Sequence, residues 1–397
     1  MLLLKNNIFK TLIQEKDISF LLLGLTLFLL PFSINLSTFT LILSLAFKFV
    51  QVFVFDFRVF RTKALKASAC IGFVFFAYMI LLSILQTGLS HTIDMFGKQF
   101  QHWMLLFLVP MLLRERNINT ILIKVFFLGL CISICYVFAL SYINGNTLDQ
   151  DSFESIIDIH HTYLSVFLLF IINHVLIKLI KNQNNLSIPQ VIVQVAIISG
   201  AFWLIYLVDS KVSIILFVVL FIIHVFPELS KENAVKYLLI FLTILAAFYV
   251  FNHKLKTSYE TALDFRLQIW DASVENIESH PFFGNLHASE KELLNYQHYL
   301  NGKYYYLDRD LNSHNQYLSI LLKYGVFGFM ILSSYCVLLF KNTNPKTGKI
   351  VMRETIGFLA IVLLVFYIEN VLDRHHGIVF FTVFYNYYLV AVENAEI

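Results

Sequence analysis

Charged residues are scarce in this sequence. Only 14% of its 397 residues are Asp, Glu, Lys or Arg, and 58% are hydrophobic. A soluble chain of this length would carry roughly a quarter charged residues, so the deficit excludes an ordinary soluble protein. The net charge of +3 identifies no class of partner. No nucleotide-binding loop and no nucleic-acid motif is present, so we predict no nucleic-acid partner.

Cysteine is also scarce. The four cysteines all fall inside apolar stretches, where this residue type usually serves as a small packing side chain; they are Cys70, Cys131, Cys135 and Cys336. Their spacing fits neither a zinc motif nor a redox motif. The sequence therefore predicts no disulfide framework and no cysteine metal site.

Long apolar runs dominate what remains. A transmembrane helix needs about 20 mostly apolar residues, and the chain holds about twelve such stretches separated by short polar breaks. These stretches lie at residues 18–34, 37–55, 67–86, 100–113, 119–142, 161–179, 190–208, 212–226, 237–252, 315–340, 354–370 and 377–393. The fourth is short, and we expect it to be tilted or partly re-entrant. The first run leads into the second without a cleavage site, which predicts no cleavable signal peptide. We predict an all-α polytopic membrane protein.

The Lys and Arg residues predict the orientation. With the N-terminus inside, the cytoplasmic segments hold most of them, and the short opposite loops hold only Lys98, Lys211 and Arg374. This bias places both termini in the cytoplasm and the long loop 253–313 outside. We predict one integral membrane domain, residues 1–397, with residues 253–313 as its large outer loop.

Polar residues gather at the predicted outer ends of the helices. Ionisable residues are costly in a bilayer and usually mark a pathway or a site. Five groups border the outer face: His160 with His161; Asp209 with Lys211; Arg266; His314 with Asn315; and Glu369, Asp373, Arg374, His375 and His376. We expect one outer cavity to gather them. His280, His287 and His298 of the long loop are expected to be solvated.

The long loop contains an amphipathic pattern. From Phe265 onward apolar residues recur at helical spacing, which predicts a helix that lies along the outer interface and ends before "HPFFG". Arg266 and Trp270 are four residues apart and therefore share one face of this helix.

The stretch "NSHNQYLSILLKYGVFGF", residues 312–329, combines polar residues with a membrane helix. His314 lies at or next to the helix N-terminus, and we expect Asn312 and Ser313 to cap it. Gly325 and Gly328 are expected to allow close helix contact. A neutral histidine at this place can accept a proton.

Three cations complete the outer group. Arg266, Lys211 and Arg374 supply guanidinium or ammonium donors that suit phosphate. A base together with fixed cations at the outer membrane face suits transfer from a lipid-linked pyrophosphate.

Several of these segments resemble known motifs. "SHNQYLSILLKYGVFGF" and "RLQIWDASVENIESHPFFG" are similar to paired motifs of the O-antigen ligase/polymerase superfamily, and "HHTYLSVFL" and "IENVLDRHHGIVFF" resemble two further blocks of its members. "DSKVSIILFVVL" stands where many members carry Ser-Arg, so Lys211 replaces an arginine. The resemblance spans roughly residues 160–385, and the first five helices match only in hydrophobicity.

The resemblance implies a helical membrane glycosyltransferase of the GT-C-like type in the bacterial inner membrane. It implies that a glycan moves from undecaprenyl diphosphate to an acceptor hydroxyl at the periplasmic face, without a metal or other cofactor. Carried over by position, His314 is the general base, and Arg266 and Lys211 bind the diphosphate. Lysine keeps the charge of the replaced arginine but loses its bidentate fork.

The remaining site predictions are weaker. Arg374 joins the diphosphate-binding group, and further substrate contacts are expected from His161, Asn315, Trp270 and Glu369. The acceptor stays open between lipid A-core, another glycan and a protein, so a repeat-unit polymerase and a protein O-oligosaccharyltransferase remain alternatives. A secondary transporter is the alternative from another class. It predicts charged or broken-helix sites near the membrane midplane, often in two related halves, and no internal repeat is visible.

Each assignment also has a purely structural alternative. His314 alone would serve as a capping residue at the membrane interface, and Arg266 with Trp270 as a snorkelling anchor with an aromatic belt residue. Lys211 would close a turn beside Asp209, and His161 would cap or pack. The group from Arg374 to His376 would be an exposed turn neutralised by Glu369 and Asp373.

Overall fold

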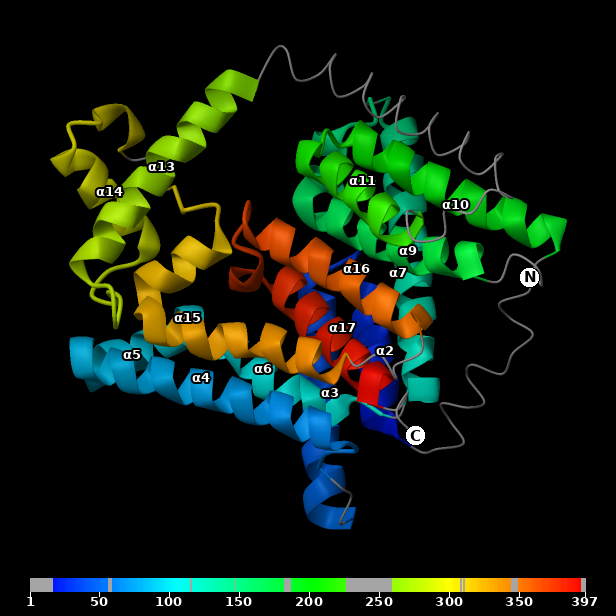
Figure 1. Ribbon diagram of the computed structural model, residues 1–397, viewed down its shortest axis with the longest axis horizontal. Helices are drawn as coiled ribbons and strands as arrows, with labels where there is room; N and C mark the ends of the chain where they lie inside the picture. The colour runs from blue at the N-terminus through cyan, green and yellow to red at the C-terminus, as the bar shows by residue number, and fades with distance from the viewer. Residues whose placement is uncertain are drawn as a thin grey trace.

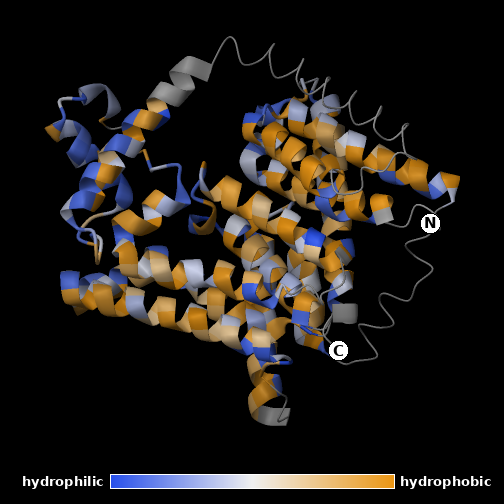
Figure 2. Cartoon of the chain, in the orientation of Figure 1, coloured by the Kyte–Doolittle hydropathy of each residue, from blue (hydrophilic) through white to orange (hydrophobic). Residues whose placement is uncertain are grey.

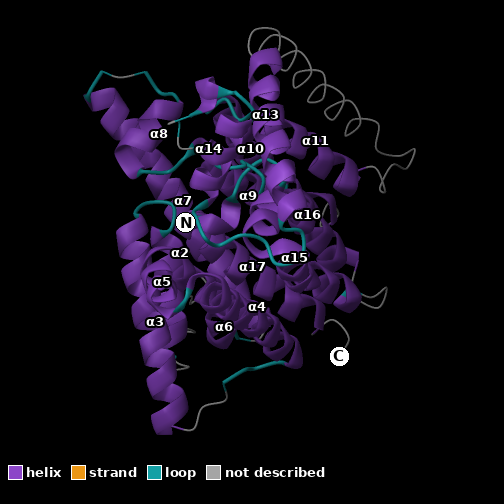
Figure 3. Cartoon of the chain, turned by 90° about the vertical axis from the view of Figure 1, so that its left-hand side faces the viewer, coloured by secondary structure: helices purple, strands orange, loops and turns teal. Residues whose placement is uncertain are grey.

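The computed structural model describes residues 17–55, 59–114, 116–145, 147–181, 187–225, 259–307, 309, 311–343 and 349–393. Within these ranges the chain is helical and contains no strand (Figures 1 and 3). The α-helices are α2 (Ile18–Leu29), α3 (Ile34–Phe55), α4 (Lys63–Thr87), α5 (Leu89–Met95), α6 (Leu105–Leu108), α7 (Arg116–Ile143), α8 (Gln150–Ile157), α9 (His161–Lys181), α10 (Ile188–Leu207), α11 (Lys211–Val225), α13 (Tyr259–Ser279), α14 (Glu290–Leu300), α15 (Gln316–Asn342), α16 (Lys349–Phe366) and α17 (His375–Glu393). The short π- and 3-10 helices are η1 (Phe96–Phe100), η2 (Gln101–Met104), η3 (Val109–Leu112), η5 (Tyr304–Tyr306) and η6 (Val371–Asp373).

Six described helices are long and apolar enough to cross a membrane. They are Ile34–Phe53, Lys63–Thr87, Asn119–Ile143, His161–Ile180, Ile188–Leu207 and Gln316–Asn342. Three shorter apolar helices join them: Ile18–Leu29, Gln101–Leu112 and Lys211–Val225. A multi-pass helical membrane protein is therefore confirmed, whereas the count of about twelve spans and the GT-C-like fold are not confirmed. The predicted span at 237–252 lies outside the described residues.

The fourth predicted span is not one continuous helix. Residues 96–112 form a succession of π, 3-10 and short α segments. Pro110 lies inside the last 3-10 segment and has no N–H to donate, which is one reason that a regular α-helix does not continue there. That this short segment is tilted or partly re-entrant stays a prediction.

Helix α17 forms the centre of the molecule. Residues 376–392 are all buried, and aromatic rings of α9, α15 and α16 pack against it. A helix that is apolar on every side belongs in a core rather than on its surface. Figure 2 shows helices α4, α10 and α11 as strongly hydrophobic, in contrast to α14.

Helices α13 and α14 form a small outer unit, which lies beside α15 and apart from α9–α11 in Figure 1. Its apolar centre contains Ile269, Ala272, Leu293 and Leu294 together with Leu322 of α15. The predicted helix from Phe265 is thus confirmed as the part of α13 that packs on α14 and α15.

A break in α15 joins this unit to the membrane helices. Gly325 has φ +65°, and residues 281–285 lie against the break: the Val326 N–H donates to the Pro281 carbonyl at 2.8 Å, and the Asn285 N–H to the Leu322 carbonyl at 2.9 Å. A Cβ at Gly325 would overlap the Phe282 carbonyl group. The segments "HPFFG" and "GVFGF" therefore contact each other and join the outer unit to α15.

Candidate active site

His314 sits in a strained turn just before α15. Its φ of +44° is rare for a residue with a side chain, and its N–H donates to Oδ1 of Asn312 at 3.1 Å. Asn315 caps α15, because its Oδ1 accepts from the N–H groups of Tyr317 and Leu318. The sequence correctly placed His314 next to this N-terminus, but its choice of Asn312 and Ser313 as caps was wrong.

Glu369 holds one side of the His314 ring. Nδ1 of His314 lies 3.4 Å from Oε2 of Glu369, whose side chain is 8% exposed, whereas the histidine is 35% exposed. Burial alone would raise the pKa of Glu369, but the hydrogen bond and charge of His314 and the charges of His160 and Arg374 outweigh it and lower the pKa. Glu369 is therefore ionised at neutral pH. An ionised carboxylate at Nδ1 favours the tautomer whose Nε2 has a free electron pair.

A buried carboxylate supports the His314 turn from below. Oε1 of Glu290 accepts the Ser313 N–H at 2.8 Å, and its Oε2 accepts the Ser319 hydroxyl at 2.6 Å. Lys323 lies 3.5 Å from Glu290 and 2.9 Å from Asp373. Burial would raise the pKa of Glu290, but Lys323 and the hydrogen bonds from Ser313 and Ser319 lower it below its ordinary value.

The segment after α16 is fastened to the same turn. Oδ1 of Asn370 accepts the Asn315 N–H at 2.8 Å, and its Nδ2 donates to Glu290 at 3.1 Å. Oε1 of Gln316 accepts the Leu372 N–H at 2.6 Å. Loops that lie about 55 residues apart in sequence are thus locked together beneath His314.

Helix α13 reaches the turn through Trp270. The indole N–H of Trp270 donates to the Ser313 carbonyl at 2.9 Å, and the ring lies 5.1 Å from that of Tyr367. Arg266 stands four residues before Trp270, about 6 Å along the helix axis. The structure therefore brings Arg266 to within one helical turn of the residue that contacts the His314 turn.

Of the other two predicted cations, Arg374 acts on the site through its charge and Lys211 begins α11. Arg374 is exposed directly after η6, and its charge acts on Glu369. Lys211 begins α11 after Asp209, whose φ is +54°. No hydrogen bond or ion pair joins the charged groups of Arg266, Lys211 and Arg374 to another side chain within the described part of the chain. For Lys211, no contact with the His314 turn is observed among the described residues.

A second polar group borders the first. His161 Nδ1 lies 3.2 Å from Oε1 of Glu154, and His160 Nε2 lies 3.8 Å from the same atom. The pKa of His160 is lowered by burial and by His161, against the opposing charges of Glu154 and Glu369. His160 and Glu369 therefore influence each other across the edge of the site.

The sequence interpretation missed the supporting residues. Glu290 is the first residue of α14, beside a capping box formed by Ser289 and Glu292, a signal that predicts a helix start but says nothing of a buried role for Glu290. His298 was expected to be solvated, but it is fully buried and its ring stacks on Tyr306 at 4.9 Å. That expectation was wrong because α14 turns this side chain into the small outer unit.

The predicted outer cavity stays a prediction, and the cavity that the structure describes lies elsewhere. A cavity of about 490 Å³ is lined by Val59, Phe60, Arg61, Thr62, Lys63 and Lys66. It lies at the start of α4, whereas the outer unit contacts α4 near its other end, where Gln86 donates to the Gly284 carbonyl at 3.1 Å. Around His314 the described structure shows a partly exposed imidazole above the buried residues Glu369, Glu290 and Asn370.

Comparison with known proteins agrees with the motifs. No curated protein matches the chain. Residues 195–333 match the sequence model of the family described as O-antigen ligase. The matched range includes α11, α13, α14 and the first two thirds of α15, and so contains Lys211, Arg266 and His314. The predicted resemblance to this family is thereby confirmed over the matched range, which is about a third of the chain.

Proposed function

We propose that this protein is a glycosyltransferase of the O-antigen ligase type, with both termini in the cytoplasm and its active site at the periplasmic face of the bacterial inner membrane. It moves a glycan from undecaprenyl diphosphate to an acceptor hydroxyl with inversion and without a metal in the transfer step. The observation that supports this most is the His314–Glu369 pair, in which a partly exposed imidazole is backed by a buried carboxylate.

The pair suits general-base catalysis. Nε2 of His314 takes the proton of the acceptor hydroxyl while the acceptor oxygen attacks the anomeric carbon from the side opposite the diphosphate. The new C–O bond forms as the bond to the diphosphate oxygen breaks, and undecaprenyl diphosphate leaves with that electron pair. Glu369 stabilises the imidazolium that forms, and the imidazolium then loses its proton to water.

In this proposal the cations bind the diphosphate that leaves. The charge of Arg374 acts on Glu369, and Arg266 lies about one helical turn from Trp270; we propose that both arginines bind the diphosphate with Lys211. Fixed cations stabilise charge as it develops on a leaving group. Trp270 and Asn315 already use their polar groups on the turn and on α15, so we assign them to positioning His314. His161 remains a proposed substrate contact.

Transfer by the purified protein in lipid tests this proposal. The donor is an undecaprenyl-diphosphate glycan, offered with lipid A-core, with a free glycan repeat and with an unfolded protein as acceptor. Product on one acceptor, lost by a factor of about 10² or more in His314→Ala, supports the enzyme and identifies its acceptor class. Arg266→Ala should raise the donor requirement or abolish transfer, and Lys211→Arg should be tolerated.

A matched variant keeps the test specific. His287→Ala removes an exposed histidine far along the chain from the turn and should transfer at the wild-type rate. Wild-type transfer by His314→Ala would remove His314 as the base. No product on any acceptor, together with no donor binding, would favour the transporter instead.

A further inference from the structure

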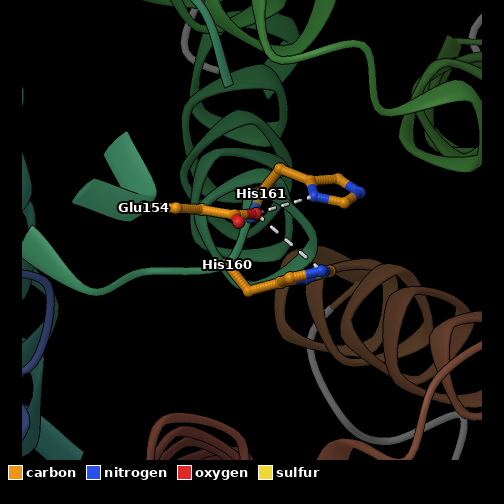
Figure 4. A group of neighbouring side chains, drawn as sticks. All are labelled: Glu154, His160 and His161. Atoms are coloured by element: carbon orange, nitrogen blue, oxygen red, sulfur yellow. Dashed lines mark hydrogen bonds and ion pairs between the residues drawn. The ribbon is translucent and has the colours of Figure 1, made fainter. Parts of the chain in front are cut away.

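Three side chains that can ligate a metal meet where α8 turns into α9. They are Glu154, His160 and His161, and Figure 4 shows both imidazoles turned toward the one carboxylate. One ligand atom from each side chain lies within 4.8 Å of the other two. Oε1 of Glu154 is 3.2 Å from His161 Nδ1 and 3.8 Å from His160 Nε2.

The local fold builds this arrangement. Asp149 begins α8 through a capping box with Ser152, and Asp158 ends it in the left-handed conformation at φ +53°. This reversal returns the chain so that the start of α9 faces Glu154, which lies about one helical turn before the end of α8. The two histidines are neighbours in sequence, yet their ring centroids lie only 4.1 Å apart.

The types of the three ligand atoms favour zinc over calcium and magnesium. Two imidazole nitrogens and one carboxylate oxygen form a ligand set that zinc takes readily, whereas calcium and magnesium prefer oxygen alone. Ligands at about 2.0–2.1 Å around a tetrahedral ion lie about 3.3 Å from one another. The 3.2 Å separation between Glu154 Oε1 and His161 Nδ1 already matches this spacing. The separation from Glu154 Oε1 to His160 Nε2 is longer, at 3.8 Å, but the three side chains are 25–36% exposed, so small rotations shorten it. We propose that Glu154, His160 and His161 form a zinc site that leaves its fourth position to water.

A simple helix cap explains less of this geometry. Glu154 does accept the His161 N–H at 3.4 Å, as a capping carboxylate would. A cap does not require both rings to turn to the same oxygen. His161 contacts Glu154 through its backbone N–H and its ring, whereas His160 contacts Glu154 through its ring. An ion held by all three side chains would tie α8 to α9. It also adds positive charge beside Glu369, with which His160 already interacts. The zinc site does not depend on the proposed transfer reaction.

Metal titration of the full chain tests this site. The protein is purified in lipid nanodiscs without a histidine tag, and Zn²⁺ binding is followed by calorimetry, with Co²⁺ absorption as a second probe. We expect one ion per chain. His160→Ala, His161→Ala and Glu154→Gln should each weaken binding by about tenfold or more, because each removes one ligand or its charge. His280→Ala, which removes an exposed histidine outside the group, should bind like the wild type.

Two further measurements keep the test decisive if a variant folds poorly. Zinc should raise the melting temperature of the wild-type protein, because an ion that binds only the folded state stabilises it. X-ray absorption of the zinc-loaded wild type should show only nitrogen and oxygen ligands, with two imidazoles. Absence of saturable binding, equal binding by all four variants, or a zinc environment without imidazole would each overturn the proposal.

Discussion

At the scale of single residues, His314 is held in place by groups of very different exposure. Its ring is open to an acceptor, whereas Glu369, Glu290 and Asn370 beneath it are buried. A buried polar network holds a structure rigid only when each of its polar groups has a hydrogen-bond partner. Each of these three residues has one. The turn is therefore rigid where it is hidden and free where it would meet substrate.

Glu369→Gln should lower the maximal transfer rate by about 10²-fold or more, with a smaller change in the apparent affinity for the donor, because an amide cannot stabilise the imidazolium. The pKa of Glu369 lies below its ordinary value of 4.5, so this residue is ionised throughout pH 5–8. The loss should therefore be similar across that range. Rates measured between pH 5 and 8 check this, with Glu278→Gln at an exposed position as the control. A variant as fast as the wild type would contradict the pairing.

Glu290→Gln should destabilise the protein by about 1–3 kcal/mol, because the neutral amide leaves Lys323 with one carboxylate fewer. The pKa of Glu290 is lowered on folding, so its contribution is present above about pH 4.5 and is lost as the pH falls through the lowered value. Melting temperatures at pH 7 and pH 4 measure both effects. We expect the difference between wild type and variant to shrink at the lower pH, and a constant difference would contradict the ion pair.

At the scale of elements, Gly325 is the position on which the outer unit depends. Gly325→Ala places a side chain at φ +65° and against the Phe282 carbonyl, which should cost about 1–3 kcal/mol and loosen the "HPFFG" contact. The matched control is Gly200→Ala in α10, where an added Cβ meets nothing within 4 Å. Melting temperature and protease resistance of residues 281–307 compare the two variants. Equal stability of both would show that the break is not required.

The sequence predicted some elements better than others for physical reasons. Helices with a long apolar run, such as α4, α7 and α15, follow directly from hydropathy. The break at Gly325 could not be predicted, because glycine is also common where helices pack closely, which was the role expected of it. Likewise, Glu154 and Glu290 lie in ordinary polar segments. The turn after α8 brings Glu154 to the histidines, and the tertiary fold brings Glu290 to Lys323.

At the scale of the whole molecule, the charge bias makes a prediction about orientation. In a background without the four native cysteines, Lys291→Cys on α14 should react with a membrane-impermeant thiol reagent in cells whose outer membrane alone is opened. Lys341→Cys at the end of α15 should react only after the inner membrane is opened. Both positions are exposed, so a difference reports the side of the membrane. The reverse labelling pattern would invert the topology.

The break in α15 also defines what can be exchanged between related proteins. Residues 281–285 and 322–327 share hydrogen bonds and leave no room for a side chain at Gly325, so neither segment fits a foreign partner without adjustment. Residues 291–307 make no such bond to α15 and carry the exposed tyrosines Tyr296, Tyr299, Tyr304 and Tyr305. A chimera that replaces this short module alone leaves the junction and the His314 turn intact. If the proposed function holds, grafting at these boundaries tests whether this module sets the acceptor preference.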